Sequence, residues 1–478
     1  MKKTMLYTAV FAILSSPAFC SNDAETLKQG LINFDKRFSL VDVFDGGNNL
    51  TISFPETTIL KQQLDADGKI KNITETIPAY KSNAVKNGLF QGNDVYEITS
   101  SSVNELLSYL YNKHNMSNVN AKSILSKVKF VPNLHFIKSL NVDVQGMVLT
   151  STDIRTGLKN EVGGVKKISF KSDINQSADK ITYNALWYGQ DISYNMMIFK
   201  LFVPEITNRI SAIFENNDKI DYSKIPLDST SMQKSQSFLK LNNAELEIIG
   251  IPVKANIVVA NNAHVGENSK TISLVGKFDV TDINTQFASQ NVPYEIKTKY
   301  ILSNIDREKA DYLQKLQKQL KDTQKSKTSI QPTSEETSLK KSCAAAAEDV
   351  VKDIKLRLQA DIKYKNADAK LLGAFIQSNG YIVGKADIIV HNFDVLYPDY
   401  TKECEKEMSQ PHDSNTIPEI CAKNNISMAY RKYIDFSKRT TDADGQTVDK
   451  IEVIANENGI FINNNKIKDA IKIDFGNK

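Results

Sequence analysis

The residues best suited to chemistry in this chain are serines that precede a lysine by three positions. Penicillin-recognising enzymes use this S-x-x-K spacing to activate a nucleophilic serine. The pairs are Ser126–Lys129, Ser231–Lys234 and Ser338–Lys341. The Lys-Thr-Gly motif of those enzymes is absent, and a lysine-rich chain generates the spacing by chance. No G-x-S-x-G elbow occurs either, so we assign no catalytic residue.

The histidines could bind a metal only if the fold brought them together. They are far apart in sequence, and none has a histidine four positions away: His114, His135, His264, His391 and His412. A zinc site needs three or four converging ligands. His412 with Asp413 is the one local cluster, and we interpret it as part of a surface loop. No phosphate-binding glycine motif is present, so we expect neither a metal nor a cofactor.

Two Asp-Ala-Asp-Gly sequences, at residues 65–68 and 442–445, resemble the start of a calcium loop. An EF-hand register would place Thr440 first and Ile451 twelfth, where the loop requires a bidentate carboxylate. Asp-Gly between two alternating runs is also the strongest short signal of a β-hairpin. We therefore predict turns at both positions.

Cysteines are few, and three of the four lie late in the chain. We predict a disulfide between Cys404 and Cys421, which would stabilise the fold by about 3 kcal/mol. Free thiols, or a pairing that includes Cys343, are the alternatives. Cleavage of a leader after Ala18 would leave Cys20 in place and make the number of cysteines even.

The densest apolar stretch after the leader covers residues 187–202. It is either ordinary core or a surface for a lipid or protein partner. The candidate surface consists of Trp187, Tyr188, Met196, Met197, Phe199 and Phe202.

The chain begins with the three-part pattern of a secretory signal peptide, which we assign to residues 1–20. A positive start precedes an apolar run, and Pro17 and small residues follow. Cleavage is expected after Ala18 or Cys20. A membrane anchor is one alternative, but the run is shorter than the ~20 residues of a spanning helix. A lipoprotein acylated at Cys20 is the other, and the bulky Phe19 disfavours it.

Export and charge together limit the partners. No later segment is long and apolar enough to span a bilayer. The net charge of +4 is close to balance, which argues against a nucleic-acid partner. We expect a periplasmic protein, with secretion or surface attachment as alternatives, and an envelope lipid or protein as the partner.

Alternating apolar and polar runs dominate the sequence. They predict a mainly β (α+β) fold of extended, twisted antiparallel sheets with a few peripheral helices. Hairpins are predicted at 38–54 and 59–77. Further strands are predicted at 140–149, 165–170, 181–187, 238–249, 253–260, 271–280, 294–302, 354–364, 381–395, 428–436, 450–455 and 459–467.

Helical spacing of apolar residues appears in a few places. Short helices are predicted at 102–111, 121–128 and 205–214, and longer ones at 306–323 and 335–352. The polar stretch 324–338 is either a domain linker or the tip of a helical hairpin, and we favour a hairpin inserted at about 305–352.

With 478 residues, the chain exceeds the ~250–300 at which one core usually stops growing. We predict an N-terminal β-rich domain with short helices at 21–215 and a polar linker at 216–235. A C-terminal antiparallel β domain at 236–478 would contain the helical hairpin.

In style, the long alternating strands are similar to those of large bacterial envelope proteins with extended sheets. We therefore expect a non-enzymatic envelope or secreted protein that acts by binding. One alternative is a carrier of lipid or another apolar ligand in the bacterial envelope. The other is an envelope hydrolase of an unrecognised class.

Overall fold

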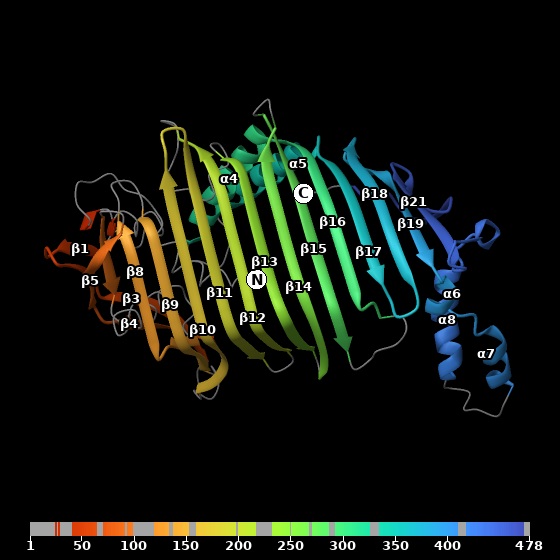
Figure 1. The fold of residues 1–478 in the computed structure, drawn as a ribbon, viewed down its shortest axis with the longest axis horizontal. Helices are drawn as coiled ribbons and strands as arrows, with labels where there is room; N and C mark the ends of the chain where they lie inside the picture. The colour runs from red at the N-terminus through yellow and green to blue at the C-terminus, as the bar shows by residue number, and fades with distance from the viewer. Residues whose placement is uncertain are drawn as a thin grey trace. The chain divides into compact units, whose positions relative to one another are not determined.

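A computed structural model describes residues 24–25, 27–28, 41–64, 70–90, 93–98, 119–132, 137–152, 159–196, 199–216, 232–248, 250–266, 270–285, 292–325, 334–409 and 417–472. The chain forms two compact units, residues 1–254 and 255–478. Both are mainly antiparallel β-sheet with few helices (Figure 1), which confirms the predicted fold class. The predicted signal peptide, the helix predicted at 102–111 and most of the predicted linker lie outside the described residues.

The first unit is built on one long series of antiparallel strands. In spatial order they are β1 (Asp42–Asp45), β2 (Asn49–Phe54), β5 (Tyr80–Phe90), β6 (Asn93–Ile98), β8 (Leu125–Pro132), β9 (Ile137–Thr152), β10 (Lys159–Gln176), β11 (Lys180–Met196), β12 (Phe199–Glu215) and β13 (Met232–Ile248). In addition, β7 (Val119–Lys122) pairs with β9, and β3 (Thr57–Leu64) pairs with β4 (Ile70–Ile77) in a separate hairpin. The two predicted N-terminal hairpins are therefore confirmed.

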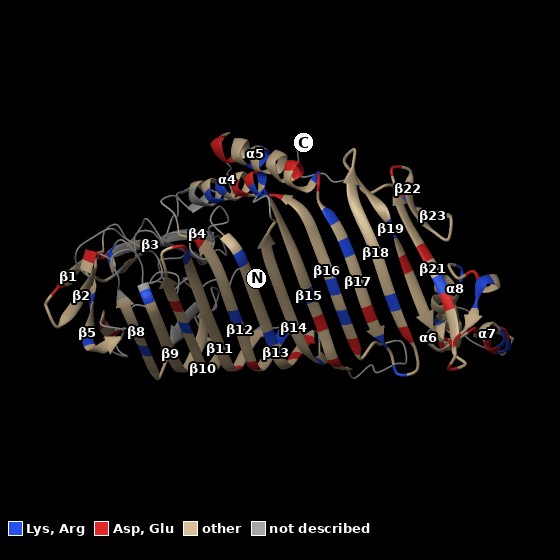
Figure 2. Ribbon diagram, turned by 45° about the horizontal axis from the view of Figure 1, so that its top comes forward, with Lys and Arg blue, Asp and Glu red and all other residues tan. Residues whose placement is uncertain are grey.

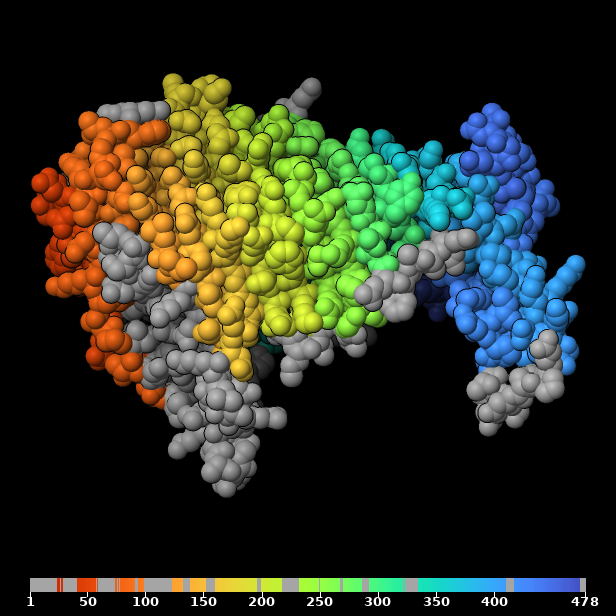
Figure 3. All heavy atoms as spheres, turned by 60° about the horizontal axis from the view of Figure 1, so that its bottom comes forward, coloured from red at the N-terminus to blue at the C-terminus, as the bar shows by residue number. Residues whose placement is uncertain are grey.

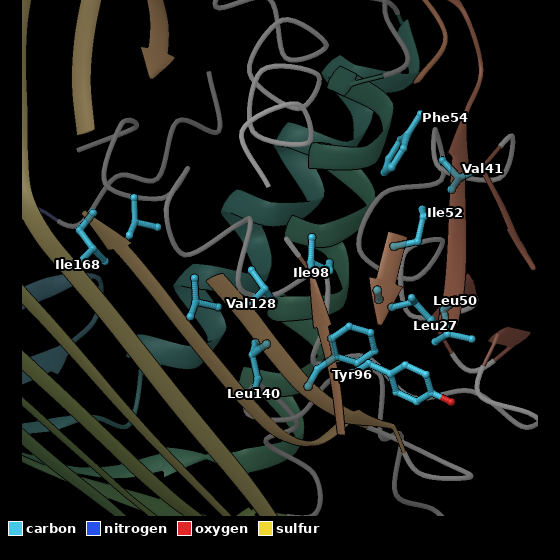
Figure 4. Close-up of a cluster of buried hydrophobic side chains, with 14 of the residues drawn as sticks. Leu27, Val41, Leu50, Ile52, Phe54, Tyr96, Ile98, Val128, Leu140 and Ile168 are labelled. Carbon is cyan, nitrogen blue, oxygen red and sulfur yellow. The ribbon is translucent and has the colours of Figure 1, made fainter. Parts of the chain in front are cut away.

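The core of the first unit follows from strand alternation, because successive side chains point to opposite faces of a sheet. In β2, Leu50, Ile52 and Phe54 are buried and the residues between them are half-buried. Figure 4 shows these side chains turned toward Tyr96 and Leu140, which come from other strands of the same unit. The cluster is an ordinary hydrophobic core.

The second unit carries a sheet and two groups of helices. Its strands are β14 (Ile251–Val265, from residue 255 onward), β15 (Thr271–Thr285), β16 (Glu295–Asp306), β17 (Lys355–Lys363), β18 (Asp368–Ser378), β19 (Tyr381–His391), β20 (Thr440–Thr441), β21 (Thr447–Asn456), β22 (Gly459–Ile462) and β23 (Asn465–Lys468). From β15 to β19 each strand pairs antiparallel with the next, and β19 then pairs with β21.

A helical hairpin interrupts this sheet between β16 and β17. Its helices are α4 (Arg307–Lys325) and α5 (Ser334–Val351), as the sequence predicts. Leu316 of α4 and the small residues Ala344 and Ala346 of α5 are buried, which gives the two helices an apolar seam.

A second helical group follows β19, and we call residues 393–438 the helical cap. It contains α6 (Phe393–Leu396), α7 (Thr401–Met408), α8 (Glu419–Arg431) and the short 3-10 helix η3 (Phe436–Lys438). Figure 3 shows the residues around α7 and α8, in blue, protruding beyond the cyan residues of the sheet.

Two predicted helices are wrong because their apolar spacing has another cause. Residues 205–214 belong to β12. Residues on one face of a regular strand are an even number of positions apart. Val203 and Ile206 are both buried although they are three positions apart, so the alternation shifts by one residue near Pro204. That change imitates a helical stripe. Residues 121–122 belong to β7 and residues 125–128 to β8.

The strand predicted at 428–436 is also wrong. Its first residues complete α8, which ends at Arg431, and the rest lead into η3. The strand predicted at 381–395 ends at His391, where α6 soon begins. Cys421 of α8 is bridged to Cys404 of α7, and the buried Ser427 donates to the carbonyl of Pro398. At the end of β19, Val390 packs with Phe393 and Leu396. Such tertiary contacts override an alternating sequence.

Candidate ligand-binding face

The structure separates the serine and lysine of the S-x-x-K pair in β8. Ser126 is fully buried, and its Oγ lies 2.5 Å from Oγ of Ser123. Lys129 is an odd number of positions away, so it faces the other side of the sheet and pairs with Glu97 at 3.1 Å. Ser338 and Lys341 are exposed on α5, and Ser231 lies outside the described residues.

The second Asp-Ala-Asp-Gly sequence forms the predicted turn. The backbone N–H of Gly445 donates to the carbonyl of Asp442 at 3.2 Å, and Gly445 has φ of 78°. His391, at the end of β19, places Nδ1 2.8 Å from Oδ1 of Asp368. Within the described ranges, no group of three or more histidine, cysteine or acidic residues could hold a metal ion.

The predicted disulfide joins Cys404 of α7 to Cys421 of α8, with their Cα atoms 4.8 Å apart. The bridge ties together the two longer helices of the cap. Cys343 of α5 is a half-buried free thiol, and burial raises its pKa.

The apolar segment 187–202 does not form one surface. Trp187 packs against the buried Val203 and Ile206. Tyr188 is its neighbour in β11 and therefore faces the other side of the sheet. Phe202 follows Leu201, which packs in the same cluster as Trp187, and is 37% exposed on the opposite face. Phe199 lies between Met196 and Ile248 in the register, whereas Met197 and the side chain of Met196 lie outside the described residues.

A larger apolar surface lies in the second unit, on one face of the strands from β15 to β21. Because directly paired residues point to the same side, the register defines four rows across these strands. Row 1 is Leu274, Leu302, Leu356, Phe375, Gly384 and Ala455; row 2 is Gly276, Tyr300, Leu358, Gly373, Ala386 and Val453; row 3 is Phe278, Thr298, Ala360, Leu371, Ile388 and Ile451; row 4 is Val280, Ile296, Ile362, Ala369, Val390 and Asp449. We call this the apolar face.

The apolar face contains no lysine, arginine or glutamate in these rows, and Asp449 is its one charged residue. The other side of the same strands, which we call the charged face, is different. Lys385 pairs there with Glu452, and Glu295 lies 2.8 Å from Lys297 and 2.9 Å from Lys363. Hydrogen bonds from these two lysines lower the pKa of Glu295. Figure 2 shows the blue and red positions that recur along these strands.

The exposure of the apolar face shows which part of it is covered. Val390, in row 4, is 5% exposed and packs with Phe393, Leu396 and Ile434 of the cap region. Between β15 and β18, by contrast, no large apolar side chain in the four rows is buried within the described structure, and Phe278 is 42% exposed. The cap therefore covers one corner of the face, and the large apolar side chains between β15 and β18 are half-exposed or exposed.

Aromatic rings lie flat across glycines on this face. A Cβ atom on Gly276 would lie 1.9 Å from Cζ of Tyr300, which comes from the neighbouring strand. A Cβ on Gly384 would lie 2.7 Å from Cδ1 of Phe375 and 2.2 Å from the carbonyl oxygen of Ala374. An aromatic ring that lies over a glycine on the neighbouring strand fills the space of the missing side chain, so the apolar surface has no gap there.

The corner under the cap is closed by paired charges. Arg439 holds Asp449 through Nε and Nη2, each 2.8 Å from a carboxylate oxygen, and also binds Asp394. Arg431 contacts the same Asp394, and both guanidinium groups lie against the ring of Phe436 at 4.9 and 4.7 Å. Two cations face two anions, so the cluster carries no net charge for an external anion.

No family model, curated protein or solved structure matches this chain. Among the described helices, none has the length and apolar character needed to cross a membrane. The apolar face is therefore interpreted from its own chemistry and geometry.

Proposed function

We propose that this protein is an exported, non-enzymatic carrier that holds the acyl chains of a lipid on the apolar face of its second unit. The observation that carries the proposal is the pairing of an apolar, half-exposed face with a charged face on the same strands. Soluble proteins rarely expose large continuous apolar surfaces unless something binds there.

The chemistry of the face favours an acyl chain over a protein partner. A protein interface usually has polar groups that fix the register of the partner. Rows 1 and 2 offer no charged group for that purpose between β15 and β19. An acyl chain needs none, and each buried methylene contributes about 0.8 kcal/mol.

The size of the face also suits a long chain. Five steps between neighbouring strands, each about 4.8 Å, make a row about 24 Å long. An extended acyl chain could lie across the strands, along a row, with the flat rings of Tyr300 and Phe375 beneath it.

Other features support the compartment and the absence of a catalytic role in this proposal. The leader at residues 1–20 supports export, and a disulfide such as Cys404–Cys421 suits an oxidising compartment. The separation of Ser126 from Lys129 gives the hydrolase alternative no support.

A matched pair of leucines on β18 allows a direct test. Leu371 lies on the apolar face, and Leu372, which is 53% exposed, lies on the charged face. The protein is purified from its own host, and co-purified lipid is measured by native mass spectrometry and by extraction. We expect bound lipid in the wild type, a several-fold loss in Leu371→Asn and no change in Leu372→Asn. A lipid-free wild type, or equal losses in both variants, would contradict the proposal.

A further inference from the structure

One polar side-chain pair is built into the open part of the apolar face. The rows contain two uncharged polar residues, Thr298 and Tyr300. The hydroxyl of Thr298 already donates to the backbone carbonyl of Phe278 at 2.7 Å. The hydroxyl of Tyr300 instead crosses β15 and donates to Oδ1 of Asn261 in β14.

This contact depends on a glycine. The ring of Tyr300 occupies the space above Gly276, where any side chain would overlap it. Tyr300 can therefore lie along the sheet and reach a residue two strands away. The half-buried pair stands beside Gly276, among the leucines of rows 1 and 2.

The hydrogen bond leaves the donors of Asn261 available. An asparagine amide has one acceptor oxygen and two N–H donors. Tyr300 occupies Oδ1, and within the described structure the side chain of Asn261 has no other hydrogen-bond partner. A carbonyl that leaves water for an apolar surface loses free energy unless it finds a donor there.

Resting on the carrier function proposed above, we infer that Asn261 donates a hydrogen bond to a carbonyl oxygen of the ligand. The ligand class is then an acyl ester or acyl amide rather than a plain hydrocarbon. Asn261 is the contacting residue. Tyr300 is a positioning residue, because it fixes which end of the amide faces the ligand.

The test compares two probes with the same number of carbons, methyl palmitate and heptadecane, in the full-length protein. Each is delivered from cyclodextrin, and its affinity is measured by displacement of N-phenyl-1-naphthylamine. We expect Asn261→Leu to weaken the binding of methyl palmitate by about three- to tenfold, which is the effect of losing one hydrogen bond. The affinity for heptadecane should not change. Tyr300→Phe should lower the same selectivity ratio by a smaller factor.

Two further variants separate selectivity from damage to the fold. Asn262→Leu alters the neighbouring exposed asparagine and should behave as the wild type. Asn261→Asp keeps an acceptor for Tyr300 but has no N–H donor, so it should lose the selectivity as Asn261→Leu does. If Asn261→Leu and Asn261→Asp leave the ratio of the two affinities, methyl palmitate over heptadecane, unchanged, this inference is overturned. The carrier function would not be affected by that result. Failure of the wild type to bind either probe would overturn both.

Discussion

Arg439 holds both carboxylate oxygens of Asp449, with Nε and Nη2 each 2.8 Å away. Asp449 is 1% exposed, at the corner of the apolar face that the cap covers. Removing one partner of a buried ion pair leaves an uncompensated charge. We therefore expect Arg439→Leu to lower the free energy of unfolding by about 3–5 kcal/mol, measured by urea denaturation.

The double variant Arg439→Leu/Asp449→Leu is the matched control for this prediction. It removes both charges together, so it should recover part of the stability lost in Arg439→Leu. A double variant as unstable as the single one would show that the loss in Arg439→Leu does not come from an unpaired Asp449 carboxylate.

The buried phenol of Tyr183 predicts a loss of stability in alkali. Tyr183 is 6% exposed on β11, and burial raises its pKa to about 12. An unfolded tyrosine titrates near 10. The stabilisation that the buried, neutral phenol gives the folded protein is therefore fully present below about pH 10. As pH rises toward the pKa of the folded state, the free energy of unfolding falls by about 2–3 kcal/mol in total. Urea denaturation between pH 9 and 12 should show this fall in the wild type and less of it in Tyr183→Phe. Parallel curves for the two proteins would refute the assignment.

The disulfide predicts a local effect on the helical cap. Cys404 and Cys421 are separated by 17 positions, a loop length for which closure contributes about 3 kcal/mol. Cys404→Ser should therefore speed hydrogen exchange in α7 and α8 and leave the strands of the first unit unchanged. Reductant should have the same effect on the wild type, whereas Cys343→Ser should exchange like the wild type. Unchanged exchange in α7 and α8 of Cys404→Ser would be incompatible with a structural role for the bridge.

The contact between Gly276 and Tyr300 can be tested by a double-mutant cycle. A methyl group on Gly276 would overlap the Tyr300 ring, so Gly276→Ala should destabilise the protein by about 1–3 kcal/mol. In a Tyr300→Leu background the ring is gone and the same change should have little effect. Equal effects of Gly276→Ala in both backgrounds, measured by thermal unfolding, would show that the ring does not lie over the glycine.

Much of the fold could be predicted from local pattern. The alternation in residues 354–358 predicts a strand with one apolar face, and β17 has that form. The Asp-Gly turn at 442–445 and the Cys404–Cys421 bridge also follow from neighbouring residues. The helix predicted at 205–214 was wrong because the alternation of buried residues in β12 shifts near Pro204. The strand predicted at 428–436 was wrong because its alternating sequence lies partly in α8 of the cap.

The candidate site was harder to find from the sequence because it is not local. Row 1 runs from Leu274 to Ala455, so its members come from strands far apart in the chain. Each strand shows its own alternation, but the sequence does not reveal which residues stand opposite each other. The segment 187–202 is conspicuous because its apolar residues are consecutive, yet consecutive residues of a strand face opposite sides.

Photocrosslinking tests the apolar face most directly. A palmitic acid analogue with a diazirine near the end of its chain is bound to the full-length protein, irradiated and mapped by peptide mass spectrometry. We predict adducts on Leu358 and Leu371, which lie on the apolar face, and none on their strand neighbours Gln359 and Leu372. Adducts spread equally over both faces, or found only outside β15 to β21, would contradict the assignment of this face as the lipid site.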